Sequence, residues 1–208
     1  MNFKYFLVFL SLFSFASLGF AQNDNVGLFI SLRGAASVPT AQFKSDASDG
    51  GSAITGLGGS VEAGIRFTPN FSVSANWLTF DNPIADGAVY LPQDGPWRSN
   101  FVMVKFNGHL PLGNRVTLDG GLMAGPAWVR FPQGEFTLDD LNPQQVDQRS
   151  GGFGLGGHFA VNYHIDQFIS FQLGTSYLAA NPDFDQSGQV IQRRIRTLLP
   201  QAGITLTL

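Results

Sequence analysis

The chain has 208 residues, enough for one domain or for one barrel with a removable leader. Charged residues make up 13%, about half their usual share in soluble domains, whereas there are 25 glycines and 20 phenylalanines. The net charge of −3 argues against a nucleic-acid partner, which needs a basic face. Because cysteine is absent, disulfides, thiolate metal sites and the cysteine-linked anchor of a lipoprotein are excluded.

The N-terminus has the pattern of a secretory signal peptide. Lys4 precedes an apolar run over 6–20, and small residues follow at the spacing that a signal peptidase reads. A permanent helical anchor is the alternative, but it needs about 20 apolar residues, and this run is shorter and contains serines. The sequence therefore predicts a signal peptide over 1–21, cleaved after Ala21, and one mature domain over 22–208.

The mature region alternates between apolar and polar residues along eight segments. A period of two predicts strands with one apolar face. No other segment is long and apolar enough for a membrane helix, so any membrane residence must be as strands. The predicted strands are 26–39, 59–68, 71–81, 99–112, 116–131, 152–165, 168–180 and 191–208.

The connections between these segments are alternately very short and long. The short ones have tight-turn sequences, Pro69-Asn70, Gly113-Asn114-Arg115 and Asp166-Gln167. The long ones are 40–58, 82–98, 132–151 and 181–190. Bacterial transmembrane barrels have short periplasmic turns and long extracellular loops. The sequence thus predicts an all-β fold, an eight-stranded antiparallel up-and-down barrel.

Periodicity alone does not tell which face points outward, because a soluble barrel also alternates, with its apolar face inside. The glycines favour a polar interior, since they fall on the polar face, where a narrow lumen has little room. These glycines are Gly64, Gly121, Gly125, Gly154, Gly156, Gly174 and Gly203. Aromatic residues near strand ends suit the interfacial girdles of a membrane barrel. The candidates are Phe67, Phe71, Trp77, Phe80, Trp128, Tyr163 and Tyr177.

The C-terminal segment carries a family resemblance. Gln201 is followed by Gly203 and then by Leu206 and Leu208, which resembles the insertion signal of outer-membrane barrels, although the commonest pattern ends in an aromatic residue. With the leader and the strand count, residues 26–208 resemble the small eight-stranded outer-membrane barrels of the OmpA and OmpX types. The resemblance implies insertion by the barrel-assembly machinery and a role in envelope stability, adhesion or slow permeation.

A set of charged or titratable residues falls on the inferred inner face. The set is Arg33, Glu62, Arg66, Lys105, His109 and Asp119. Because an unpaired buried ion costs several kcal/mol, we expect these groups to pair. Counting back from the turn at Asn114 places His109 opposite Asp119. The set forms either an ion path or proton relay, or a plug of paired side chains, and the narrow lumen of eight strands favours the plug.

Catalysis and metal binding find little support. Small barrel enzymes place their acid and base groups at the lipid or extracellular end, and the base is usually a histidine. Here His109 and His164 lie near predicted periplasmic turns and His158 lies mid-strand. The segment 183–188 resembles the start of a calcium loop, but the twelfth position is Arg194 where a bidentate Glu is required. We expect no catalytic residue, cofactor or metal.

Arginines mark one end of the apolar face. Arg194 and Arg196 lie just above the apolar band on the loop side, with Arg130 at a similar height. Guanidinium groups match phosphates well, so the sequence predicts contact with outer-membrane lipid and lipopolysaccharide. Snorkelling arginines without a specific ligand are the alternative.

The long connections hold most of the acidic residues and few cations. The acids include Asp46, Asp49, Asp86, Glu135, Asp139, Asp140, Asp147, Asp183 and Asp185, and the cations are Lys44, Arg98 and Arg149. We expect a non-enzymatic outer-membrane barrel of a Gram-negative-type bacterium, whose loops contact surfaces or partners that the sequence does not name. The alternatives are a small diffusion channel or solute conduit and, third, a lipid acyltransferase or protease barrel.

Overall fold

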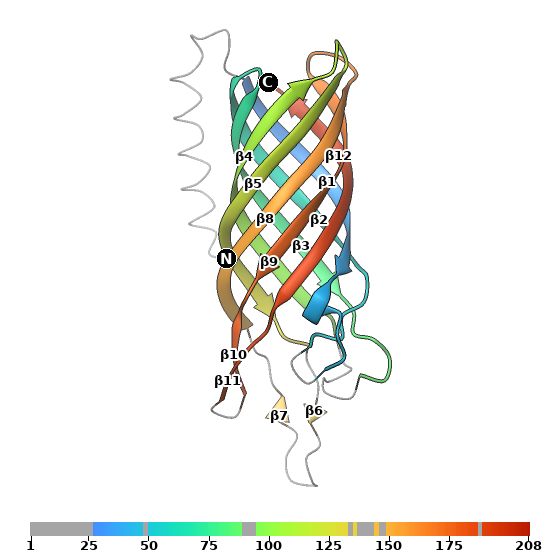
Figure 1. The fold of residues 1–208 in the computed structure, drawn as a ribbon, viewed down its shortest axis with the longest axis vertical. Coiled ribbons are helices and arrows are strands. Elements are labelled where there is room, and N and C mark those ends of the chain that lie inside the picture. The colour runs from blue at the N-terminus through green and yellow to red at the C-terminus, as the bar shows by residue number, and fades with distance from the viewer. Residues whose placement is uncertain are drawn as a thin grey trace.

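The computed structural model describes residues 27–47, 50–88, 95–132, 135–136, 144–145, 149–186 and 189–208. The predicted signal peptide, 1–21, lies outside the described residues. Eight long strands close into a barrel (Figure 1). They are β1 (Gly27–Pro39), β2 (Gly56–Thr68), β3 (Phe71–Asn82), β4 (Trp97–Pro111), β5 (Val116–Arg130), β8 (Arg149–His164), β9 (Ile169–Ala180) and β12 (Ile195–Thr207).

Short elements lie at the end of the barrel that carries the long connections. They are the 3-10 helix η1 (Ala41–Phe43) and the paired strands β6 (Glu135–Phe136) with β7 (Gln144–Gln145) and β10 (Asp183–Gln186) with β11 (Gln189–Gln192). The segment predicted as one strand over 191–208 is therefore two, because β11 pairs with β10 before β12 enters the barrel. Within the described ranges, no helix is long and apolar enough to span a membrane.

Each barrel strand pairs antiparallel with its neighbours in sequence, and β1 closes the barrel against β12, with Leu32 opposite Ile204. The predicted up-and-down architecture is confirmed. The short connections and the C-terminus share the upper end in Figure 1. At these tight turns, Gly113 adopts φ 105°, a conformation that glycine tolerates best, and Asp166 Oδ1 accepts the N–H groups of Phe168 and Ile169.

The outer wall of the barrel is apolar. Leu122 is 73% exposed and Leu173 is 68% exposed, and the outward positions of every barrel strand include exposed large apolar side chains. A continuous apolar exterior of this extent is stable only against an apolar medium. The prediction that the apolar face points outward is therefore confirmed. One girdle assignment was wrong: Phe80 is 2% exposed and stacks inside the barrel on Phe101, with 5.7 Å between ring centroids.

The interior is layered, whereas the sequence analysis predicted a polar lumen throughout. The inward residues of β4, taken from the loop end to the turn end, run Trp97, Ser99, Phe101, Met103, Lys105, Asn107 and His109. The turn half of the interior is polar, whereas the loop half holds an apolar layer. Beside that layer is one buried polar group, in which Ser37 Oγ donates to Asn82 Oδ1 at 2.8 Å and lies 2.9 Å from Thr197 Oγ1. The apolar layer consists of Leu78, Phe80, Phe101, Met103, Met123, Ala127, Leu178, Ala180 and Leu199.

Candidate functional site

The polar half of the lumen centres on Glu62. Its Oε2 pairs with Arg33 Nη2 and, at 2.8 Å, with Lys105 Nζ. Ser74 Oγ donates to the other carboxylate oxygen at 2.5 Å. All four side chains are buried, so water does not screen their interaction. We call Arg33, Glu62, Ser74 and Lys105 the charged cluster.

A second network joins β8, β9 and β12 across the same level. Gln201 Nε2 donates to Ser176 Oγ at 3.0 Å and lies 3.1 Å from His158 Nδ1, which lies 3.0 Å from Ser176 Oγ. Gln201 and Gly203, predicted as part of an insertion signal, thus have a packing role in the lumen. A Cβ at Gly203 would collide with the backbone of Leu32 and with the Arg33 side chain, so the glycine makes room for the charged cluster.

The other two residues of the predicted insertion signal point away from the lumen. Leu206 is 46% exposed and Leu208 is 73% exposed. They continue the apolar outer wall to the turn end of β12, where Leu208 N–H donates to the Leu28 carbonyl. The motif therefore combines a lumen-packing half, Gln201 and Gly203, with an outward apolar half.

His109 links a serine to a carboxylate at the turn end of the lumen. His109 Nδ1 lies 2.7 Å from Asp119 Oδ1, and its Nε2 lies 2.8 Å from Ser72 Oγ. An ionised carboxylate only accepts, so Nδ1 donates to it, and the Ser72 hydroxyl can either donate to or accept from Nε2. The sequence analysis expected the contact with Asp119 but missed Ser72, which completes an arrangement of the serine-hydrolase type.

The surroundings of Ser72 do not suit catalysis. Ser72 has no exposed surface, and the adjacent cavity, lined by residues that include Arg66, His109, Asp119 and His164, has a volume of about 20 Å³. This space holds about one water molecule, far less than an ester or peptide substrate. A serine nucleophile also needs an open approach to its Oγ. The geometry therefore supports a structural role for the Ser72–His109–Asp119 chain.

Arg66 differs from the rest of the predicted lumen set. It lines the small cavity at the turn end and is half-buried, and its Nε has no hydrogen-bond partner among the described residues. The structure brings together Arg33, Glu62 and Lys105 in one cluster and His109 and Asp119 in another. Arg66 joins neither by an ion pair within the described part of the chain.

Aromatic side chains close the loop end of the lumen. The ring of Trp97 packs edge-on against Phe43, Phe131 and Phe184 at centroid distances of 5.7, 4.8 and 6.0 Å. Trp97 Nε1 donates to the Gly51 carbonyl at 2.8 Å. We call these four residues, with Val129 and Ile195 beside them, the aromatic plug. Sequence reasoning missed the plug because its residues come from five separate parts of the chain: η1, β4, the end of β5, β10 and β12.

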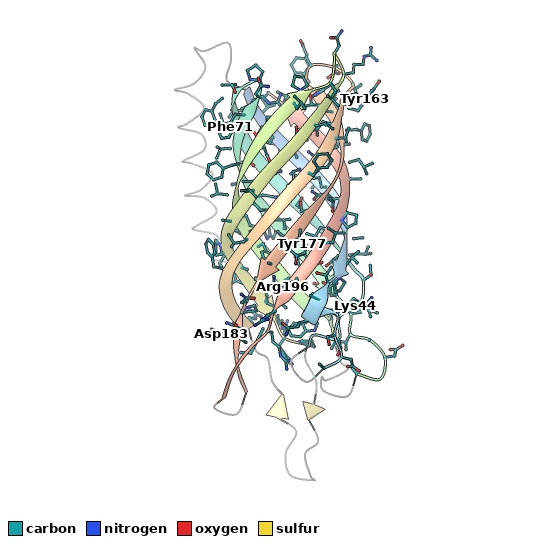
Figure 2. All side chains as sticks on the ribbon, in the orientation of Figure 1. Lys44, Phe71, Tyr163, Tyr177, Asp183 and Arg196 are labelled. Carbon is teal, nitrogen blue, oxygen red and sulfur yellow. The ribbon has the colours of Figure 1, made fainter. Side chains whose placement is uncertain are left out.

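The predicted rim residues Arg130, Arg194 and Arg196 lie near the loop end, and two further arginines join them there. Arg98 and Arg149, assigned to loops, are strand residues of β4 and β8 and flank Arg130 on β5. Arg196 lies on β12 opposite Ala179, and Arg194 is exposed just before β12. Figure 2 shows Arg196, Lys44 and Asp183 toward the loop end and Phe71 and Tyr163 toward the turn end.

The loop acids are only partly covered by the structure. Asp46, Asp86 and Asp183 are exposed, and the described part of the segment that resembled a calcium loop, 183–186, is strand β10, which pairs with β11. Asp49, Asp139, Asp140 and Asp147 lie outside the described residues. The structure describes the backbone of Glu135 and Asp185 within β6 and β10.

Comparison with known proteins identifies the fold. No family model and no curated protein matches the chain. Neisserial surface protein A superposes with a TM-score of 0.62, a major outer membrane protein of Thermus thermophilus with 0.54, and OprG of Pseudomonas aeruginosa with 0.52. Identity is 13% in each case, and the matches cover 87%, 87% and 90% of this chain and 97%, 99% and 98% of the others, respectively. The chain has the fold of small outer-membrane barrels.

Proposed function

We propose that this chain is a non-enzymatic barrel of the outer membrane that anchors itself rigidly and uses its long connections for contacts at the cell surface. One observation carries the proposal: the aromatic plug, the apolar layer and the charged cluster fill the interior in succession. A barrel filled in this way has no space for a substrate or a solute path. Function then rests with its outer surface and its loops.

The apolar exterior supports residence in a bilayer. Outer-membrane lipid, including lipopolysaccharide, would contact this wall, and the barrel-assembly machinery would insert it. The outward Leu206 and Leu208 at the end of β12 suit that role, since the last strand ends in exposed apolar side chains. A partner that approached the long connections would meet exposed acids such as Asp46 and Asp86.

A small diffusion channel is the second candidate, favoured by the polar turn half of the lumen. Lys105, Glu62, His109 and Asp119 would line the entrance to such a path. The apolar layer, which lies next to them toward the loop end, opposes ion passage. An ion that entered would lose its hydration among Met103, Phe101 and their neighbours. We therefore rank the channel below the anchored display barrel.

The loops can be separated from the barrel by experiment. Replacing residues 133–148 with a short Asn-Gly turn shortens one long connection. Arg130 on β5 and Arg149 on β8 stay strand partners in this variant. The matched control inserts sixteen Gly and Ser residues at Gly113-Asn114, at the opposite end. Both variants should migrate faster unboiled than boiled in SDS gels, because the closed sheet persists.

The readout is the binding of expressing cells to glass and to plates coated with matrix protein. We expect the shortened variant to lose several-fold in binding and the control to keep it. Full binding by the shortened variant, with solute uptake that depends on the barrel, would instead favour the channel.

A further inference from the structure

Three arginines stand side by side on the outer wall at the loop end. Arg98 on β4 is the partner of Arg130 on β5, and Arg130 is the partner of Arg149 on β8. Arg98 and Arg149 are exposed and Arg130 is half-buried. Partner Cα atoms on adjacent antiparallel strands lie about 4.5–5.5 Å apart, so the three side chains leave the wall within about 10 Å of one another. We call them the arginine row.

The arginine row concentrates positive charge. Asp81 is the next residue in the same row, and its Oδ2 lies 3.5 Å from Arg98 Nε. Arg130 also takes part in an interaction within the chain. Like charges at directly opposite strand positions repel one another. A ligand with several negative charges would offset this repulsion. Guanidinium groups bind phosphate in particular, through paired hydrogen bonds.

The outer wall between the arginine row and the middle of the barrel has features of a lipid-binding surface. Trp128 is exposed next to the row and is paired with Gly151 on β8, a position typical of an interfacial tryptophan. Further toward the turn end, the same strands carry an apolar groove of about 510 Å³. Its lining includes Leu122, Ala124, Leu155, Gly157, Tyr177 and Ala179. The groove exists because alanine and glycine stand between larger side chains.

The spacing between the row and the groove matches one leaflet. Arg130 and Ala124 are six residues apart on β5, which is roughly 20 Å along a strand. With a strand tilt of about 35–45°, this corresponds to a depth of roughly 15 Å, half of a hydrocarbon core of about 30 Å. With Arg130 at the headgroups, the groove lies where the acyl chains of that leaflet end.

We propose that Arg98, Arg130 and Arg149 bind the phosphates of one lipid A headgroup and that the groove receives an acyl chain of the same molecule. A headgroup with two phosphates fits a row that spans about 10 Å better than a single phosphodiester does. The inference rests on the proposed membrane residence and names one lipid for it. It differs from the rim predicted from the sequence, since it replaces Arg194 and Arg196 by Arg98 and Arg149.

The test compares two double variants of the refolded barrel in detergent, by native mass spectrometry with bisphosphorylated lipid A as the probe. Arg98→Ser with Arg149→Ser should weaken binding by about tenfold or more, since each loses charge-assisted hydrogen bonds. The matched control, Lys44→Ser with Arg194→Ser, removes two exposed cations at the same end and should change binding less than twofold. Unboiled SDS migration verifies that both variants are folded.

A second arm tests the groove. Gly157→Leu should fill it with little strain, because a Cβ there would meet only the Gly121 carbonyl oxygen, at 3.9 Å. Gly34→Leu is the control, since it points into open space on β1. We expect the first variant to weaken lipid A binding several-fold and the second to leave it unchanged.

Dephosphorylated lipid A and phosphatidylglycerol are the comparison lipids, and both should bind about tenfold more weakly than lipid A. Equal binding of all three lipids, or equal losses in the two double variants, would overturn the inference. A folded barrel would then still anchor and display its loops, so the proposed function would stand. Failure of the folded barrel to insert into vesicles would contradict both the proposed function and the lipid A site.

Discussion

Lys105 on β4 reaches past β3 to Glu62 on β2, where its Nζ lies 2.8 Å from Oε2 of the carboxylate. Arg33 on β1 pairs with the same oxygen, and Ser74 on the intervening β3 donates to the other. Four consecutive strands are thereby joined through one side chain. The charged cluster acts as a brace across this half of the barrel wall as well as a filler of the lumen.

Removing the central carboxylate should destabilise the barrel strongly. Glu62→Ala leaves two buried cations without their partner, and breaking a buried ion pair in this way costs about 3–5 kcal/mol. The control is Asp81→Asn, which breaks an exposed pair with Arg98 and should cost under about 1 kcal/mol. The free energy of unfolding in denaturant, measured in vesicles, compares the two. Equal small losses would show that the charged cluster does not brace the wall.

The three tryptophans should report their different surroundings. Trp97 has no exposed surface, whereas Trp77 is 50% and Trp128 is 48% exposed on the outer wall. In single-tryptophan variants reconstituted in vesicles, brominated lipids should quench Trp77 and Trp128 and leave Trp97 unaffected. Aqueous iodide should also fail to reach Trp97. Efficient iodide quenching of Trp97 would mean that water enters the loop end of the lumen.

The Ser72–His109–Asp119 chain should be chemically inert. Ser72 is fully buried, so an ester-sized reagent cannot reach its Oγ. We expect no labelling of the folded barrel by a fluorophosphonate probe, and no ester hydrolysis above that of a Ser72→Ala control. Labelling of the native protein that this substitution abolishes would make the barrel an enzyme.

The two ends of the barrel should differ in their access from outside the cell. Protease added to intact cells should cut within 132–151 before it cuts at Gly113-Asn114, because exposed loop tips are nicked first and the short turn is expected to face the periplasm. The fragments can be mapped by mass spectrometry. Cleavage at Gly113-Asn114 first would invert the orientation.

Register explains which lumen contacts were predictable. β4 and β5 are joined by a tight turn, so counting residues back from it placed His109 opposite Asp119. β3 and β4 are joined by a long connection whose length does not fix their register. The contact between Ser72 and His109 therefore could not be counted from sequence, although alternation already turned Ser72 inward.

Alternation also has a limit inside the barrel. It predicts which residues face inward, but it does not require inward residues to be polar. Met103, Met123, Leu178 and Leu199 face inward and belong to the apolar layer, which was not predicted because the inward face was interpreted as polar along its whole length. The layer is a tertiary property, since it becomes visible only when the levels of several strands are aligned.

Closure of the lumen is most directly tested by single-channel recording on the refolded protein in a planar bilayer. We expect no steady openings, because in the described part of the barrel the aromatic plug, the apolar layer and the charged cluster fill the lumen in succession. Glu62→Ala and Trp97→Ala should introduce leaks or destabilise the barrel. Steady, well-resolved openings of the unmutated protein, unchanged by either substitution, would contradict a closed interior and establish the barrel as a channel.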